Sequence, residues 1–278
     1  MTQLETIFFW TTVIILAGAS SIFAAGLAFR KDVAIKGAFW IVACASATLT
    51  IAIVSRWIAT GHFPLMDEYE NSLTAAWLIM AIYIGLRHKI RGLRSLGIVA
   101  APISLIILGL GVMSGPRLSP LTPPYKSIWL YAHMSFSQLT VVSMLIAFGL
   151  AVLYLVKARD KQANGQPVRL ERLPTAEVLD DLSFRFIIFG YITATLMIIT
   201  GAIWANHLWG NYWNWDPIET WSLVTWLIYG IYLHTRFSYG WSGRRASWFA
   251  IIATISVIIN FWGIAYVTNT FHILSKLR

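Results

Sequence analysis

The chain has 278 residues, of which 58% are hydrophobic and only 12% are charged. This composition excludes an ordinary soluble domain, in which roughly a quarter of the residues carry a charge, and it predicts a polytopic membrane protein. The net charge of +9 does not indicate nucleic-acid binding, because the cations lie in short segments between apolar stretches.

Eight apolar stretches are candidates for helices that cross the bilayer, which needs about 20 residues to span roughly 30 Å of hydrocarbon. Charges, prolines or polar segments bound each of them. In chain order they are Ile7–Phe29, Gly37–Val54, Tyr69–Leu86, Ser95–Met113, Ile128–Val156, Phe184–Trp204, Pro217–His234 and Ala246–Ala265. The sequence therefore predicts an all-α fold, a polytopic membrane bundle of about eight transmembrane helices that forms one integral membrane domain over residues 1–278.

The cations are divided unevenly between alternate loops. One side collects 16 of the 21 Lys and Arg, and the other keeps Arg56, Arg117, Lys126, Lys276 and Arg278. The positive-inside rule places the richer side in the cytoplasm, so both termini are expected outside. The first span is expected to stay as an N-out anchor in a bacterial plasma (inner) membrane, without signal-peptide cleavage.

The segments between the spans carry few signs of chemistry. The polar connector at about 157–185 is expected on the cytoplasmic side and is typical of a solvated loop. The acidic residues Asp67, Glu68 and Glu70, at the end of the first external loop, are expected to form a partly solvated cluster beside a helix N-terminus. Cys44 is the only cysteine, which excludes an intrachain disulfide and a CxxC pair.

The third external loop, at about 205–216, concentrates aromatic rings. Six of the fourteen tryptophans lie between residues 204 and 226, and three of them, Trp209, Trp213 and Trp215, fall in one short run with Tyr212. An interfacial aromatic belt would explain such a run, and so would a platform for a large planar ligand.

The residues that follow this loop have the pattern of a helix start. Asp216 is suited to accept the first backbone N–H groups, Pro217 is suited to the first helical position, and Glu219 can reach back to the cap. The positive end of the seventh helix is then expected directly beneath the tryptophans.

Two histidines favour the ligand platform over the aromatic belt. His133 lies near the outer end of the fifth span, and Ser137 and Thr140 share its helix face, which we expect to point into the bundle. His272 follows the eighth span on the same outer side. Two imidazoles from different helix ends, beside an aromatic platform, suit the two axial positions of a haem iron.

The other histidines are more ambiguous. His234 lies 17 residues after Pro217, so the helix carries it about 25 Å inward, too far to share an iron with His133 and His272. It serves a second haem position nearer the cytoplasm, or it is an interfacial residue that snorkels with its neighbours. His62 and His207 lie in external loops, where an exposed histidine needs no special role.

The segment WGNYWNWDPIETWSLVTWLIYGIYLHTR resembles the tryptophan-rich WWD signature of haem-handling proteins, and specifically the CcsA/ResC-type family of cytochrome c biogenesis (System II). The WGxYWxWDPxExW core, the following helix and the YLHxR ending agree in order. The segment GHFPLMDEYENSL is similar to the family's first external-loop motif, although Asp67 replaces the usual asparagine. The residues around His272 depart from the family's usual sequence.

The resemblance implies haem delivery and presentation on the outer face of the membrane, for covalent attachment to a CxxCH apocytochrome c. It implies a ResB/Ccs-type membrane partner, and haem b (iron protoporphyrin IX) bound transiently as a substrate. His133 and His272 correspond to the external iron ligands, and His234 corresponds to the intramembrane histidine of a second haem site. The signature would hold haem over Trp209, Trp213, Trp215 and Asp216, while Arg56, Arg117 and Lys126 are the external cations expected to meet its propionates.

Other functions stay open at this point. A CcmC-like haem chaperone or exporter would lack a synthase role, and six spans are expected there. A secondary transporter would use His234 on a substrate route, and a purely structural subunit would tolerate loss of His133. The sequence has no residues in catalytic-triad order and no phosphate-binding loop. It leaves open whether the chain is an enzyme that acts as a haem-attachment subunit within a complex. A thylakoid membrane is the alternative location.

Overall fold

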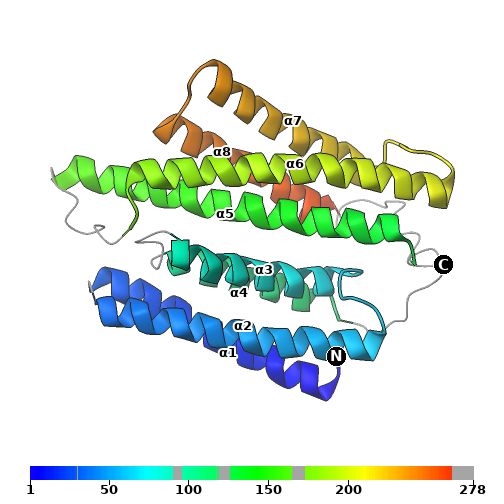
Figure 1. Ribbon diagram of the computed structural model, residues 1–278, viewed down its shortest axis with the longest axis horizontal. Coiled ribbons are helices and arrows are strands. Elements are labelled where there is room, and N and C mark those ends of the chain that lie inside the picture. The colour runs from blue at the N-terminus through cyan, green and yellow to red at the C-terminus, as the bar shows by residue number, and fades with distance from the viewer. Residues whose placement is uncertain (30, 90–95, 117, 119–125, 165–172, 265–278) are drawn as a thin grey trace. The chain divides into compact units, whose positions relative to one another are not determined.

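The structure is a computed structural model of the chain, and it describes residues 1–29, 31–89, 96–116, 118, 126–164 and 173–264. Within these ranges the chain is all-helical, and its eight α-helices follow the order of the predicted spans (Figure 1). They are α1 (Gln3–Ala28), α2 (Asp32–Thr60), α3 (Glu68–Lys89), α4 (Gly97–Met113), α5 (Ile128–Asn164), α6 (Ala176–Trp209), α7 (Pro217–Ser238) and α8 (Gly243–Ile258), which continues into the π-helix η3 (Ile259–Gly263). The predicted polytopic membrane bundle is confirmed.

Five of these helices are long and apolar enough to cross a membrane, among the residues that the structure describes. They are α1, α2, α5, α6 and α8 with its π-helical end, and α4 is a shorter apolar helix. The predicted spans in α3 and α7 are less apolar, since α3 begins with Glu68 and Glu70, and α7 carries Glu219 and Arg236 and is rich in Trp and Tyr. The orientation of the termini stays a prediction.

The helices extend beyond the apolar stretches from which they were predicted. Helix α5 runs to Asn164 and α6 begins at Ala176, so both ends of the connector expected at 157–185 are helical. Helix α2 continues to Thr60 and α6 to Trp209, which shortens the first and third external loops. Hydrophobicity marks the part of a helix that lies in hydrocarbon, whereas backbone hydrogen bonding continues into the polar interface.

By its contacts the chain divides into two compact units, Met1–Leu121 with Val156–Ala176, and Thr122–Leu155 with Glu177–Arg278. In the first unit α1 and α2 pack as an antiparallel pair whose buried positions are spaced alternately by four and three residues, the pattern of a coiled coil. These positions are Glu5, Phe9, Thr12, Leu16, Ala19, Phe23 and Gly26 in α1, and Ile35, Ala38, Val42, Ala45, Leu49, Ala52 and Arg56 in α2.

A cluster of buried charges lies where α1 begins and α2 ends. Arg56, only 1% exposed, donates from Nε to Glu70 and from Nη2 to Asp67, both at 2.9 Å. Its Nη1 lies 3.6 Å from the buried carboxylate of Glu5. Glu70, expected in a partly solvated cluster, is instead buried inside this ion-pair network. One guanidinium therefore ties α1, α2 and α3 together.

The carboxylates of this cluster also begin the helices that carry them. Thr2 and Glu5 form a reciprocal capping box at the start of α1. Asp67 accepts the Glu70 amide at 2.7 Å, and Glu70 accepts the amide of Met66 at 2.8 Å. The side chains of Thr2, Glu5, Asp67 and Glu70 thus accept hydrogen bonds from backbone N–H groups that have no partner within the helices.

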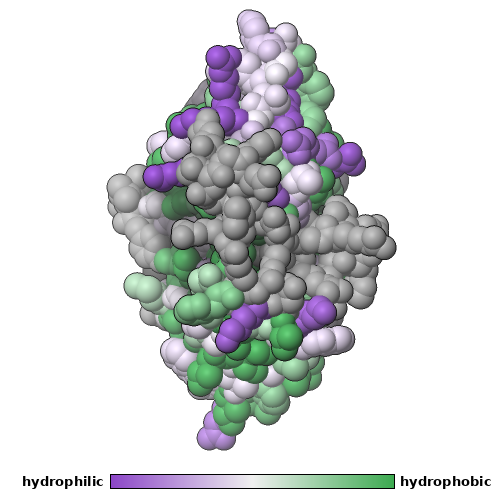
Figure 2. All heavy atoms as spheres, turned by 90° about the vertical axis from the view of Figure 1, so that its left-hand side faces the viewer, coloured by the Kyte–Doolittle hydropathy of each residue, from purple (hydrophilic) through white to green (hydrophobic). Residues whose placement is uncertain are grey.

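The second unit packs α5, α6, α7 and α8 around a core of alanines, methionine and buried tyrosines. Helices α5 and α6 are joined by hydrogen bonds between Thr140 and Thr193 at 3.0 Å and from Ser183 to the Ala147 carbonyl at 3.1 Å. The hydroxyl groups of these three side chains are thereby paired, as the interior of a bilayer requires. The upper part of Figure 2, which draws the end of this unit near the turn between α7 and α8, carries hydrophilic side chains in purple.

We predict that Arg56→Leu lowers the free energy of unfolding by about 3 kcal/mol or more, because the buried carboxylates of Glu5 and Glu70 lose their cation. Unfolding in mixed detergent, followed by circular dichroism, measures the change. Arg185→Leu is the control, since Arg185 pairs with Asp181 at the surface and its loss is expected to change stability by less than about 1 kcal/mol. Equal effects of the two substitutions would contradict the structural role of the cluster.

Candidate functional site

The aromatic loop begins at the end of α6. Trp209 is the last residue of that helix, and its ring meets Trp204 edge to face at 5.3 Å between centroids. Gly210 ends the helix with a φ of +79°, and its N–H donates to the Asn206 carbonyl at 2.9 Å. A left-handed residue at this position favours glycine because a Cβ would be strained there. The loop is therefore shorter than predicted, from 210 to 216.

The start of α7 has the geometry that the sequence predicted. Asp216, only 3% exposed, accepts the N–H of Ile218 at 2.9 Å, and Glu219 reaches back to the N–H of Asp216 at 3.3 Å. Pro217 occupies the first helical position. The buried carboxylate of Asp216 thus serves as a cap, and a direct contact between Asp216 and a ligand stays a prediction.

Glu219 makes a further hydrogen bond that the sequence pattern did not predict. Its Oε2 also accepts the N–H of Asn214, at 2.8 Å. A capping box accounts for the bond to Asp216 alone, and nothing in the sequence marks the second donor. The aromatic loop is therefore attached to the first turn of α7 by one carboxylate oxygen.

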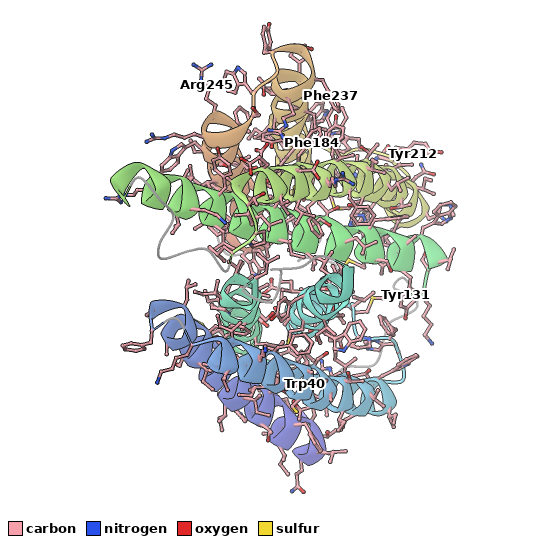
Figure 3. The ribbon with its side chains drawn as sticks, turned by 60° about the vertical axis from the view of Figure 1, so that its left-hand side comes forward. Trp40, Tyr131, Phe184, Tyr212, Phe237 and Arg245 are labelled. Atoms are coloured by element: carbon pink, nitrogen blue, oxygen red, sulfur yellow. The ribbon has the colours of Figure 1, made fainter. Side chains whose placement is uncertain are left out.

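Two aromatic side chains of the loop are presented to the outside. Trp215 is 70% exposed and Tyr212 is 62% exposed, and Figure 3 shows Tyr212 pointing away from the helices. Trp213 packs edge to face on Trp215 at 5.8 Å, and its buried Nε1 has no hydrogen-bond acceptor among the described residues. Trp215 has a φ of +55°, which is rare for a bulky residue. The loop thus exposes a wide aromatic surface on a strained backbone.

We predict that Trp215→Gly is more stable than Trp215→Ala by about 1 kcal/mol, because only glycine adopts a left-handed backbone without strain. The measurement is the unfolding midpoint of both variants in detergent. At Trp221, inside α7, the order should reverse, since alanine is the better helix former by about 1 kcal/mol. The same order at both positions would show that residue 215 is not held left-handed.

His133 lies on α5 against the middle of α6. Its Nδ1 lies 2.8 Å from the carbonyl oxygen of Met197, and because a carbonyl only accepts, the ring nitrogen is the donor. Gly201 makes room for the ring, since a Cβ there would lie 2.6 Å from Nδ1. The hydrogen bond to Met197 and the space at Gly201 therefore fix the orientation of the imidazole ring. From Gly201 to Trp209 the helix rises about 12 Å, which places His133 roughly two turns from the aromatic loop.

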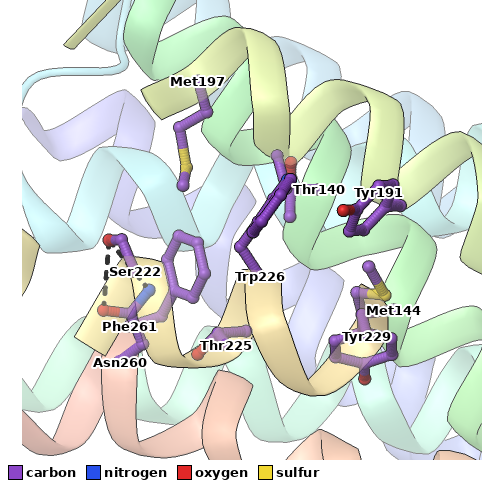
Figure 4. Close-up of a pocket in the computed structure, with 11 residues that line it drawn as sticks. Thr140, Met144, Tyr191, Met197, Ser222, Thr225, Trp226, Tyr229, Asn260 and Phe261 are labelled. Carbon is purple, nitrogen blue, oxygen red and sulfur yellow. Dashed lines mark hydrogen bonds between the residues drawn. The ribbon is translucent and has the colours of Figure 1, made fainter. Parts of the chain in front are cut away.

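The polar residues on the face of His133 point into the bundle, as predicted. Ser137 and Thr140 are buried, and Thr140 lines a small pocket in the second unit (Figure 4). The far wall of the pocket includes Asn260 of the π-helix, which donates to Ser222 of α7 at 3.3 Å. A π-turn often marks a place where a side chain is aimed at a site. The sequence pattern does not predict the π-turn that carries this asparagine.

His234 occupies the other end of α7, far from the aromatic loop. It is exposed, with Nδ1 3.3 Å from the Ser238 hydroxyl and its ring edge to face with Tyr239 at 5.7 Å. Since α7 is continuous from Pro217 to Ser238, the separation of about 25 Å expected from the sequence applies. An exposed imidazole on a membrane helix is a candidate ligand for a group bound from outside this chain.

The chain around His234 is held by a pair that sequence reasoning missed. Arg236 makes a bidentate pair with Asp180 of α6, and it also donates to the Trp241 carbonyl at 3.0 Å. Asp180 accepts the amide of Gly243 at 3.0 Å. Beside this pair, Phe184 packs against Phe237 at 5.5 Å, as Figure 3 shows. The turn between α7 and α8 is therefore fixed to α6.

We predict that Asp180→Ala lowers the free energy of unfolding by about 3 kcal/mol, because it leaves the largely buried Arg236 without its carboxylate. The neighbouring Asp181→Ala is the control, since that carboxylate is 53% exposed and its pair with Arg185 is worth less than about 1 kcal/mol. Thermal unfolding of both variants in detergent measures the difference. Indistinguishable variants would mean that the pair does not hold the turn.

Several predicted site residues lie elsewhere than expected or are not described. Arg56 is buried among carboxylates and is not available for a ligand's anionic groups, contrary to prediction. His272 and Arg117 lie outside the described residues, so the pairing of His133 with His272 stays a prediction. Lys126 is exposed, as is His207, whereas His62 is buried 3.9 Å from Glu70.

The chain is similar to known proteins over most of its length. A family profile described as "Cytochrome C assembly protein" matches residues 65–272. Over 270 residues the chain is 36% identical to "Cytochrome c biogenesis protein CcsA" of Guillardia theta, covering 89% of this chain and 88% of that protein. Proteins of the same name from Prochlorococcus marinus and Synechococcus elongatus are 32% and 33% identical, and these matches cover 81% and 77% of this chain and 79% and 78% of those proteins.

A solved structure shares the fold. The chain is similar to "Cytochrome c Heme Lyase CcmF" with a TM-score of 0.72 over 94% of this chain, at 16% sequence identity. The chain spans 47% of the length of that solved chain. At this level of identity the likeness concerns the arrangement of the helices alone.

Proposed function

Because this chain belongs to the cytochrome c assembly protein family, as a CcsA-type member that handles haem in cytochrome c biogenesis, we propose that it holds haem on the outer face of the membrane and presents it for covalent attachment. The acceptor is the CxxCH motif of an apocytochrome c. The chain acts with a membrane partner of the ResB/Ccs type. Haem b is its substrate and not a resident cofactor.

The observation that carries this proposal is the hydrogen bond that orients the ring of His133. A histidine that ligates a metal usually donates its second ring N–H to a carbonyl or carboxylate, which orients the ring and raises its basicity. His133 makes such a bond to the Met197 carbonyl at 2.8 Å, which orients the ring, and we propose that its Nε2 binds the iron. We propose His133 as one axial ligand and His272 as the other.

The aromatic loop is proposed to supply the surface on which the porphyrin lies. Trp213, Trp215 and Tyr212 provide flat apolar area, and the positive end of α7 lies beside them. Asp216 supports this arrangement as the cap of α7. Lys126, exposed just before α5, is the cation we propose for a propionate.

The chain's contribution is proposed to be positioning. Holding the iron through imidazoles while the ring edge stays open leaves the vinyl groups accessible to the cysteine thiols of the acceptor. The bonds that form are thioethers, and the thiols come from the acceptor, since this chain has a single cysteine. Whether this chain or its partner completes the reaction is decided by assays of the complex.

His234 is proposed to serve a second haem position at the opposite end of α7. It lies about 25 Å along α7 from the aromatic loop, so we propose a separate iron for it, and the pair of Asp180 and Arg236 keeps the turn below it in place. We propose that the protein lies in a bacterial plasma membrane with the aromatic loop in the periplasm, and a thylakoid membrane with the loop in the lumen is the alternative. The eight α-helices in the described part of the chain favour this function over a six-span haem chaperone.

We expect the purified protein to show a Soret band, and His133→Ala to retain several-fold less haem, because it removes an axial ligand. The measurement is haem content per chain together with reduced and oxidised absorption spectra. His272→Ala should behave similarly, and His234→Ala should remove only the fraction of haem at the inner position. His207→Ala is the control, since that side chain is exposed on the last turn of α6. Unchanged spectra in His133→Ala and His272→Ala would refute the proposed ligands.

A further inference from the structure

One carboxylate oxygen holds the backbone on both sides of Trp215. Oε2 of Glu219 accepts the N–H of Asn214 at 2.8 Å and the N–H of Asp216 at 3.3 Å. The shorter of the two bonds goes to the residue that lies outside the capping box. Glu219 therefore does more than begin α7.

This pair of hydrogen bonds requires a curled backbone at residue 215. In an extended chain, N–H groups two residues apart are separated by about 6.6 Å, which is too far for short bonds to one oxygen. The φ of +55° at Trp215 turns the chain so that the two N–H groups converge. Convergent N–H groups around a left-handed residue form a concave site for an anion, and the carboxylate of Glu219 fills it.

A tryptophan is an unfavourable residue for this conformation. Glycine or asparagine adopts it with little strain, whereas a bulky side chain does so only where its surroundings enforce it. The ring of Trp215 is 70% exposed and, apart from its edge contact with Trp213, it faces away from the packed interior. Burial of the ring therefore does not offset the backbone strain, which indicates a role for the ring at the surface.

We propose that Glu219 is a positioning residue that holds the exposed ring of Trp215 in a fixed orientation for contact with a planar ligand. The identity of that ligand as haem rests on the proposed function, but the role of Glu219 in fixing the loop does not. Glu219 lies in the first turn of α7 and acts on the ligand only through the loop.

The proposal separates Glu219 from its neighbour Asp216. Asp216 retains its own bond to the Ile218 amide at 2.9 Å when Glu219 is replaced, so α7 keeps a cap. The consequence of Glu219→Ala is then confined to the residues before the helix. Glu219→Gln keeps a side-chain carbonyl that accepts the same N–H groups without the charge.

The first experiment measures hydrogen exchange of the peptide covering 211–218 in the detergent-solubilised protein without haem. We expect the slowest amides of this peptide to exchange about tenfold faster in Glu219→Ala, because two N–H groups lose their acceptor. Glu219→Gln should stay within about threefold of the wild type. Glu177→Ala, which removes a first-turn glutamate from α6, is the control and should leave this peptide unchanged. Unchanged exchange in Glu219→Ala would overturn the proposal.

The second experiment measures haem affinity by titration of the Soret band. Trp215→Ala and Glu219→Ala are each expected to weaken binding by about fivefold, the scale of one aromatic contact. If Glu219 acts through the ring, the double variant binds no more weakly than Trp215→Ala alone. Glu219→Gln should restore most of the affinity. If the losses came from unfolding, the unfolding midpoint of each variant would fall in proportion to its loss of haem affinity.

The outcomes are distinct. Additive losses in the double variant, or full haem affinity in Glu219→Ala despite faster exchange, would overturn the positioning role. A wild-type protein that binds no haem would refute the proposed function, and the exchange experiment would still decide whether Glu219 fixes the loop.

Discussion

The reciprocal cap at the start of α7 is the interaction on which the candidate site depends. Asp216 bonds the first turn of the helix, and Glu219 bonds back to the loop, so helix and aromatic segment are fixed as one piece. Each bond satisfies a backbone donor that the helix leaves open. Together these bonds hold a short loop with three exposed or half-exposed rings in a defined conformation.

Helix-capping carboxylates also occur in the first unit, where they have a second role. There Asp67 and Glu70 begin α3, but their remaining oxygen atoms surround Arg56 together with Glu5. A buried charge is costly unless it is paired and hydrogen-bonded, and this guanidinium pairs with three carboxylates and donates hydrogen bonds from Nε and Nη2. Capping carboxylates thus brace the aromatic loop in one unit and an internal ion-pair network in the other.

The second unit separates two histidine environments. His133 is half-buried, oriented by a carbonyl and sheltered by Gly201, whereas His234 is exposed beside a turn that Arg236 and Asp180 fix. An imidazole with one nitrogen already hydrogen-bonded is preorganised for a metal. An exposed imidazole is instead accessible to a group that a partner or ligand brings.

The sequence by itself determined the all-helical membrane class, the number and order of helices, the helix start at Asp216 and the inward face of Ser137 and Thr140. These follow from apolar length, helical periodicity and capping pattern, which are local properties. Only the tertiary structure decided that Arg56 is buried, that His133 donates to Met197, that Asp180 pairs with Arg236 and that Glu219 reaches Asn214. Such contacts depend on which helix faces meet, or on the path of a loop, and the local sequence pattern predicts neither.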